Sequence, residues 1–259
     1  MKTVSALKTA TGALQWSLSE MDHSKHEFAP GMWSDARRAL WIPEARLLAV
    51  ADLHLGYAWA HRHAGQLMPI TARDTTSDRL CALVDDYEPE CLVLLGDIVH
   101  RAVPVNPVRE ALLAVLDCLP PQLAVTAVAG NHDRDIENLL RTDNRFVPVT
   151  HYCTNGCVFV HGDAASVAAA ESDIKAAKAK RGWVVIGHEH PSVTLGDGVA
   201  TWEKYPCFLV CDGLLVLPAF SQWSAGNSRD EFMSPLLECT EIKLKVGIVG
   251  DRLLPIGNG

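Results

Sequence analysis

Five separated stretches of the chain place metal-binding residue types directly after a short apolar run. The first is residues 47–51, followed by Asp52-Leu53-His54. Because residues two apart in a β-strand point to the same side, Asp52 and His54 can bind one cation together. The other four apolar runs, residues 91–95, 124–129, 158–160 and 184–186, lead into Gly96-Asp97, Gly130-Asn131-His132-Asp133, His161 and Gly187-His188-Glu189-His190.

The candidate ligands are a mixed set of oxygen and nitrogen donors. Such a set suits Mn, Fe or Zn better than Ca or Mg, which prefer oxygen ligands alone. The set is too large for one tetrahedral site, but it suits two divalent ions if a carboxylate bridges them. Asp97 is the expected bridge, because it is the lone acid at the end of what should be a central strand. The predicted metal ligands are Asp52, His54, Asp97, Asn131, His161, His188 and His190.

Two metal ions at strand ends indicate hydrolysis of a phosphate ester. Such ions bind phosphate oxygens and lower the pKa of a shared water, so that hydroxide exists near neutral pH. The leaving oxygen then needs a proton, and His132, next to the ligand Asn131, is the predicted general acid. Asp133 or another nearby carboxylate is expected to orient His132.

Basic residues near these motifs are the candidates for contact with substrate. His100 and Arg101 follow Asp97 directly, so both are expected in the active site, with Arg101 on the phosphate. Arg62 and Arg134 are further candidates, and a solvated surface position is the alternative for each.

Composition bounds the class of protein. The chain has 259 residues, 48% of them hydrophobic, which suffices for one well-packed α/β core. A formal net charge of −8 argues against a broad basic face for duplex DNA, although two divalent ions would offset it locally. The eight cysteines include no Cys-x2-Cys pair, and most are expected to be packed thiols. Cys153 and Cys157 could meet across a hairpin, but two packed thiols are the favoured expectation. No apolar run has the length of a membrane span, and a cytoplasmic location is expected.

Strand and helix patterns alternate first, and strands then dominate. Residues 39–42 and 47–51 predict a hairpin, and residues 56–69 a loop or short helix. Helices are expected over residues 71–87, 107–119, 135–141 and 164–180, and later strands over 199–202, 207–210, 214–217 and 241–249. This order predicts an α/β (α+β) fold of two packed sheets flanked by helices. Residues 1–30 form an extension, either an edge strand or disordered, and residues 31–259 a single domain.

The five motifs, in this order and spacing, resemble the signature blocks of calcineurin-like metallophosphoesterases. The resemblance implies a four-layer fold with the metal site at the C-terminal ends of strands. It also implies that Asp52, His54, Asp97 and His190 hold one metal, that Asp97, Asn131, His161 and His188 hold the second, and that His132 is the acid. Where many members carry an Asp-Arg pair after Gly-Asp, this chain has His100-Arg101.

Residues 36–224 resemble one branch more closely, the bacterial ligase-associated metallophosphoesterases. The likeness lies in residues 38–41, 51–56, 95–100 and 217–221. It implies a manganese-dependent nuclease or phosphodiesterase acting on single-stranded or damaged DNA, in functional association with DNA ligase and helicase. Two other hypotheses stay open: a phosphatase for a nucleotide, small phosphate ester or phosphoprotein, and a scaffold without catalysis. Neither a monomer nor a homo-oligomer is implied.

Overall fold

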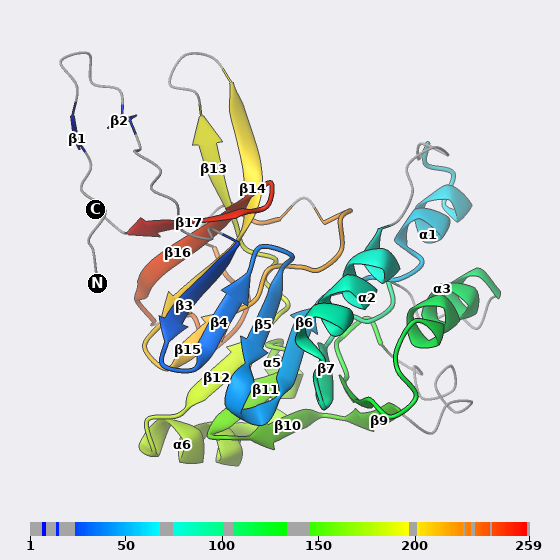
Figure 1. Cartoon of the computed structure of the whole chain (residues 1–259), viewed down its shortest axis with the longest axis horizontal. Coiled ribbons are helices and arrows are strands. Elements are labelled where there is room, and N and C mark those ends of the chain that lie inside the picture. Colours follow the sequence, from blue (N-terminus) through cyan, green and yellow to red (C-terminus); the bar gives the residue numbers. More distant parts are fainter. Residues whose placement is uncertain are drawn as a thin grey trace.

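Two β-sheets pack face to face, and helices cover their outer faces (Figure 1). This arrangement confirms the predicted two-sheet α/β fold. It appears in a computed structural model that describes residues 7–8, 14–15, 24–67, 75–100, 106–133, 146–196, 201–224, 226–228, 231–238 and 240–257.

The first sheet has seven strands in chain order, β3 to β9. Strands β3 to β6 pair antiparallel, and the predicted hairpin of β5 and β6 is confirmed, with the 3-10 turn η1 (Pro43–Ala45) between them. Strands β6 to β9 are parallel, so their carboxyl ends meet at one edge. The strands are β3 (Lys25–Ala29), β4 (Met32–Asp35), β5 (Ala39–Ile42), β6 (Leu47–Ala51), β7 (Cys91–Leu95), β8 (Ala124–Val128) and β9 (Phe146–Val149).

The second sheet has eight strands, in the order β10-β11-β12-β15-β14-β16-β17, with β13 paired to β14. Strands β11, β12 and β15 are parallel, and the others pair antiparallel. The strands are β10 (His151–Thr154), β11 (Cys157–Val160), β12 (Trp183–Ile186), β13 (Ser192–Gly196), β14 (Trp202–Cys211), β15 (Leu214–Val216), β16 (Ile242–Val249) and β17 (Arg252–Gly257).

Strand β14 differs from the two separate strands expected over residues 199–202 and 207–210. It runs without interruption through Pro206, where its pairing partner changes from strand β13 to strand β16. Pro206 is opposite Ser192 of β13, and Cys207 is opposite Gly247 of β16. Because proline lacks an N–H, it is tolerated where one ladder ends and the next begins.

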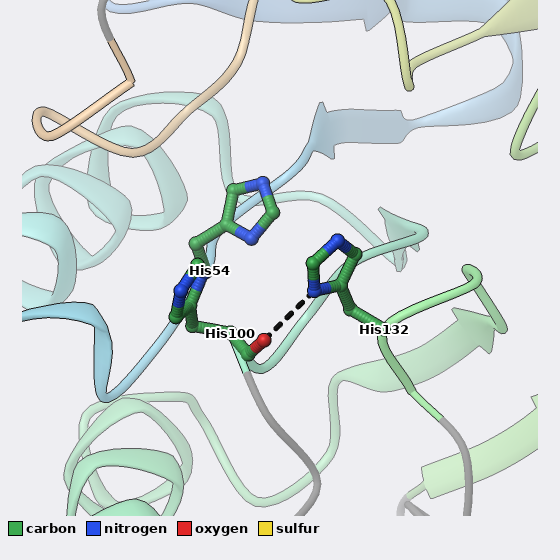
Figure 2. Close-up of side chains that lie close together, drawn as sticks. All are labelled: His54, His100 and His132. Atoms are coloured by element: carbon green, nitrogen blue, oxygen red, sulfur yellow. Dashed lines mark hydrogen bonds between the residues drawn. The ribbon is translucent and has the colours of Figure 1, made fainter. Parts of the chain in front are cut away.

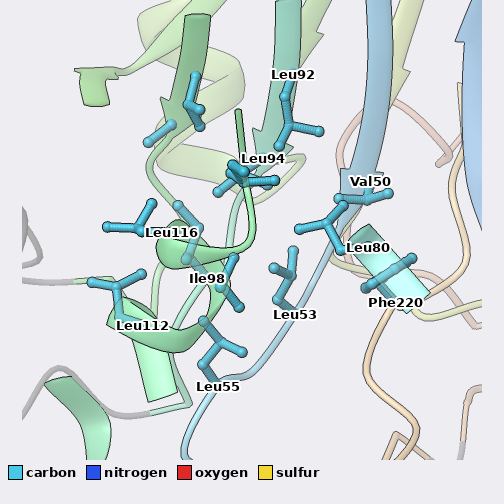
Figure 3. Packing of buried hydrophobic residues seen from close by; sticks show 14 of the residues in the cluster. Val50, Leu53, Leu55, Leu80, Leu92, Leu94, Ile98, Leu112, Leu116 and Phe220 are labelled. Atoms are coloured by element: carbon cyan, nitrogen blue, oxygen red, sulfur yellow. The ribbon is translucent and has the colours of Figure 1, made fainter. Parts of the chain in front are cut away.

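Alternating residues of the central strands face two different cores. In β6, Leu48 and Val50 pack toward helices α2 and α3, whereas Leu47 and Ala49 pack between the two sheets. Figure 3 shows the helix-facing core, where Val50 lies close to Leu80 of α2. Each leucine buried in this way contributes roughly 2 kcal/mol to the free energy of unfolding. A one-residue slip would exchange the two faces, so the pattern fixes where each strand ends.

The helices cover both outer faces. Their bounds are α1 (Tyr57–His63), α2 (Thr76–Tyr87), α3 (Asn106–Asp117), α5 (Ala164–Ala169) and α6 (Glu171–Ala179). Residues 71–74 and the helix expected over residues 135–141 lie outside the described residues. Within the described ranges, no helix is long and apolar enough to cross a membrane.

One predicted helix, residues 164–180, is two helices that break at Ala170. Its φ of −101° and ψ of 8° depart from helical values. Asp163 caps α5 by accepting a hydrogen bond from the Ala165 N–H at 3.2 Å. The two helices pack unequally: α6 buries Ile174 and Ala177 against the second sheet, whereas α5 has no fully buried residue and contacts the same core through the partly buried Val167.

The N-terminal region contributes strands of two kinds. Short strands β1 (Leu7–Lys8) and β2 (Leu14–Gln15) pair antiparallel with each other. Strand β3, within residues 1–30, pairs with β4 in the first sheet. The division between an extension and a domain at residue 30 stays a prediction.

A disulfide joins two of the covering helices. Cys81 of α2 and Cys118, just after α3, are bonded, with Cα atoms 5.9 Å apart. The sequence predicted packed thiols for most cysteines, and this pair is a correction. Its cause is spatial, because the two helices pack side by side on the same sheet face. Cys153 and Cys157 are free thiols, as expected, but only Cys157 is buried, whereas Cys153 is exposed. They do not face each other across the β10–β11 hairpin, because Cys153 is opposite Val158 and Cys157 is opposite Thr154.

Replacing Cys118 by Ser is expected to lower the free energy of unfolding by about 3 kcal/mol, because the bond closes a long loop in the unfolded chain. Urea titration of the oxidised proteins measures this. Cys153→Ser, which removes an exposed free thiol, is the control. Equal unfolding midpoints for Cys118→Ser and the unmodified protein would contradict the stabilising role.

Candidate metal centre

The predicted ligands lie in the turns that directly follow strands β6, β7, β8, β11 and β12. Many of these turns bend through left-handed backbone. The φ angles of Asp52, Asp97 and His190 are 54°, 42° and 46°, and those of His54 and His188 are also positive. Such values are uncommon for residues with a side chain and cost about 1–2 kcal/mol each. These turns bring the donor atoms of different strand ends within 4.8 Å of one another.

The first group of donor atoms contains Asp52, His54, Asp97 and His190, one atom from each lying within 4.8 Å of the others. The Nε2 atoms of His54 and His190 are 3.2 Å apart. The His190 Nε2 is 3.6 Å from Asp52 Oδ1, and the His54 Nε2 is 3.9 Å from Asp97 Oδ2. Four donors from three strand ends therefore surround one point.

The second group surrounds the Nε2 atom of His161. That atom is 3.0 Å from Asn131 Oδ1, 3.1 Å from His188 Nδ1 and 3.5 Å from Asp97 Oδ1. The structure thus brings together all seven residues that the sequence singled out as ligands.

Asp97 is shared by the two groups. Its Oδ1 faces His161 of the second group, and its Oδ2 faces His54 of the first. The backbone N–H of His132 donates to Oδ1 at 3.0 Å, which fixes the carboxylate between them. This is the placement expected of a bridging ligand.

Burial shifts the pKa values of this cluster. Burial, with the adjacent Asp52 carboxylate, raises the pKa of Asp97 to about 6. Burial, with the neighbouring His190, lowers the pKa of His54 to about 3, so the His54 ring is neutral. Burial alone would lower the pKa of His190, but the Asp52 and Asp97 carboxylates raise it.

The donor set fits two divalent cations. Each group aims lone pairs of oxygen and nitrogen atoms at one point, and imidazole nitrogens stand 3.1–3.2 Å apart in both groups. Neutral imidazole and ionised carboxylate are the forms that bind metal. In the described part of the chain, the buried Nδ1 atoms of His54 and His161 have no hydrogen-bond partner. The Nε2 atoms of the same rings face the donor groups, where cations would offset the cost of burying the Asp52 and Asp97 carboxylates.

His132 stands beside the first group. Its Nε2 lies 3.9 Å from Asp97 Oδ2, and its ring is 38% exposed. Figure 2 shows its Nδ1 bonded to the backbone carbonyl oxygen of His100, at 2.8 Å, with the rings of His54 and His100 nearby. The atom that orients His132 is therefore a carbonyl oxygen, where the sequence suggested a carboxylate.

Asp133 holds two metal-binding turns together. Its buried carboxylate accepts hydrogen bonds from the backbone N–H groups of Gly130 at 2.9 Å, Val99 at 3.1 Å and Ile98 at 3.2 Å. Burial raises its pKa to about 6. These bonds tie the turn after β8 to the turn after β7, so the described contacts of Asp133 fix backbone and do not touch the His132 ring.

Close backbone approach explains two glycines of the motifs. A Cβ atom on Gly96 would lie 1.9 Å from His161 Nδ1, and one on Gly130 would lie 2.3 Å from the Asp97 backbone nitrogen. Both contacts are far shorter than real Cβ contacts, so only glycine lets the strand ends meet this closely.

The predicted substrate residues are only partly placed. The His100 ring stacks on His132 at 5.6 Å and on His61 at 5.2 Å, beside the first group. Arg62 is exposed, and its Nε donates to the Ala58 carbonyl of the same helix. Arg101 and Arg134 lie outside the described residues.

Sequence reasoning missed two polar residues beside the candidate ligand His190. The Ser224 hydroxyl bonds to His190 Nδ1 at 2.6 Å, the kind of outer contact that fixes a ligand ring. Glu189, between the two histidines, is buried and bonds to residues 233 and 234. The signal available in the sequence was the acid Glu189 between two candidate ligands in Gly187-His188-Glu189-His190.

Comparison with known proteins agrees with this geometry. Residues 45–205 match the family model described as calcineurin-like phosphoesterase. Among solved structures, the crystal structure of Pseudomonas putida nuclease MPE is similar: TM-score 0.58, 24% sequence identity, 87% of this chain and 94% of that chain covered. No curated protein matches in sequence.

Cation binding is expected to strengthen as pH rises through about 6, because Asp97 must first lose its proton. The raised pKa of His190 acts in the same direction, since the protonated ring cannot bind metal. Below that pH, the affinity for Mn²⁺ should fall roughly tenfold for each pH unit. Calorimetric titration of the metal-free protein with Mn²⁺ at several pH values measures this affinity. A constant affinity between about pH 5 and pH 7 would contradict the role of Asp97.

Proposed function

This chain belongs to the calcineurin-like phosphoesterase family, and we propose that it is a phosphodiesterase that uses two divalent metal ions to cleave DNA. Single-stranded or damaged DNA is the proposed substrate, and manganese the proposed metal. Iron and zinc are compatible with the same ligands.

One observation carries the proposal: the Asp97 carboxylate faces two groups of donors, one through each oxygen. A single bridging carboxylate between two mixed oxygen and nitrogen sets is suited to two ions and to a phosphate lying across them. Asp52, His54, Asp97 and His190 would hold one ion, and Asp97, Asn131, His161 and His188 the other. Bound there, the two ions supply positive charge for the phosphate oxygens and make a water molecule acidic enough to give the nucleophile near neutral pH.

His132 is the proposed general acid. Its Nδ1 donates to the His100 carbonyl, so the second nitrogen, Nε2, is the one that can carry a proton toward substrate. When Nε2 gives that proton to the leaving oxygen, the ring returns to the neutral tautomer with hydrogen on Nδ1. The carbonyl accepts from Nδ1 in both forms, so the ring keeps its orientation throughout.

Other residues have supporting roles in the proposal. Asp133 keeps the His132 turn in register with the Asp97 turn through its backbone contacts. The His100 ring, stacked on His132, is a proposed substrate contact. Arg101 is the proposed phosphate contact, and Arg62 and Arg134 are further candidates.

Several points favour DNA as the substrate. The similar Pseudomonas putida protein is a nuclease, and the motifs resemble those of the ligase-associated branch. On that resemblance we also propose a functional association with DNA ligase and helicase in repair. The principal alternative is a phosphomonoesterase. A scaffold without catalysis is disfavoured, because all seven ligand candidates and His132 are present.

With Mn²⁺, the protein is expected to hydrolyse a p-nitrophenyl phosphodiester and to nick single-stranded circular DNA. Replacing Asp97 by Asn should lower both rates by about 10³-fold, or ~4 kcal/mol of transition-state stabilisation, because the bridge loses its charge. Steady-state rates and a thermal unfolding curve check the loss. Asp85→Asn, which changes an exposed acid on α2, is the matched control. Activity on p-nitrophenyl phosphate alone would replace this proposal with the monoesterase.

Replacing His132 by Ala should slow esters with poor leaving groups by about 10²–10⁴-fold, because general-acid catalysis is lost. Esters of p-nitrophenol, whose anion leaves without a proton, should slow far less. Rates across a series of phosphodiesters with leaving groups of graded pKa measure the difference. An equal loss for good and poor leaving groups would contradict the role as acid.

A further inference from the structure

The carboxylate of Glu189 binds the backbone of residues 233 and 234, more than 40 residues further along the chain. Its side chain is 3% exposed. It accepts hydrogen bonds from the Met233 N–H, at 3.0 and 3.1 Å, and from the Ser234 N–H, at 2.6 Å. A buried carboxylate bonded to consecutive backbone amides holds those amides firmly in place. Glu189 therefore fixes residues 233–234 to the turn that carries His188 and His190.

A second contact fixes the same connection nearby. The backbone N–H of Asn227 donates to the His190 carbonyl at 2.7 Å, and the Ser192 N–H donates to the Asn227 carbonyl at 2.9 Å. The Asn227 side-chain amide donates to the Glu231 carbonyl at 3.0 Å. The described residues between 226 and 234 are thus attached to the metal-binding turn at two places.

This fixed segment forms one side of the cavity over the metal groups. The cavity measures about 720 Å³ and is lined by ligands such as His54 and Asn131, by His132, and by Phe232 and Met233. Met233 is 70% exposed, one of few large apolar side chains that the described part of the chain leaves open to solvent. Phe232 is half-buried and packs on the core outside the second sheet.

We propose that Phe232 and Met233 form an apolar wall that contacts the nucleobase next to the scissile phosphate, and that Glu189 is the positioning residue for this wall. The inference rests on the proposed function and adds to it the part of the substrate that is recognised.

Three features point to a base. The cavity has the size of sites for nucleotide-sized ligands, and a phosphate on its floor leaves most of it unfilled. No Lys or Arg is among the described residues that line it, and Glu231 adds a carboxylate, so the wall side suits a neutral group better than a second phosphate. A methionine thioether and a phenyl ring both make favourable contacts with a flat aromatic ring.

The test compares two phosphodiesters with the same leaving group: the p-nitrophenyl ester of thymidine 5′-phosphate and methyl p-nitrophenyl phosphate, which lacks a base. In Met233→Ala, the ratio of kcat/KM for the thymidine ester over the methyl ester should fall about tenfold, through KM. Trp202→Ala, which removes another exposed apolar side chain from the β13–β14 hairpin that projects away from the site, should keep the ratio (Figure 1).

The role of Glu189 needs its own readout, because it lies between two ligands. Glu189→Gln should also lower the ratio of kcat/KM values, with two Mn²⁺ ions still bound by calorimetry. Met233→Ala should then have a smaller effect on the ratio in the Glu189→Gln background than in the unmodified protein, since the wall is already displaced. Independent effects would overturn the positioning role.

The outcomes separate the two claims. An enzyme inactive on both diesters would remove the proposed function and this inference together. Activity on both esters with an unchanged ratio in Met233→Ala would remove only the inference. If that variant instead changed the molar mass in light scattering, with the ratio kept, the wall would be a contact between two copies of the chain, and the base assignment would be wrong.

Discussion

Two carboxylates buried at neighbouring strand ends, Asp52 and Asp97, impose the constraint on which the rest of the centre depends. Each is almost fully removed from water, and their mutual repulsion helps to raise the pKa of Asp97. Charges buried together are unstable unless donors or cations face them. The backbone N–H groups of His188 and His132 donate to them, but hydrogen bonds alone leave net negative charge in the core. The surrounding imidazoles and the proposed cations complete the compensation.

That compensation requires an unusual backbone. Asp52, Asp97 and His190 adopt left-handed φ values, and close contacts admit only glycine at Gly96 and Gly130. A fully extended strand end would instead direct its side chains alternately to the two faces of the sheet. The surrounding sheet contacts, built from alternating apolar residues, supply the stability that holds such turns. Strain here is concentrated at the candidate metal ligands.

Much of the centre could be predicted from sequence, because apolar runs of strand length end directly in the ligands. A run such as residues 91–95 predicts a strand and, because the strand ends there, also predicts that the residues that follow lie at the edge of the sheet. The contacts that orient the proposed acid His132 could not be predicted in the same way. His132 bonds to the backbone carbonyl oxygen of His100. Every residue type has such a carbonyl, so the sequence alone does not indicate which one accepts this hydrogen bond. The Cys81–Cys118 bond likewise depends on which helices lie side by side, which periodicity does not show.

The attachment of residues 226–234 to the turn after β12 has a consequence for how such a protein can diversify. The segment that matches the phosphoesterase family model ends at residue 205, whereas the apolar wall lies beyond it. The candidate ligands and the proposed apolar wall therefore lie in different portions of the polypeptide. The later portion can therefore change in sequence without altering any candidate ligand. The condition is that Glu189 still accepts hydrogen bonds from the backbone N–H groups at positions 233 and 234.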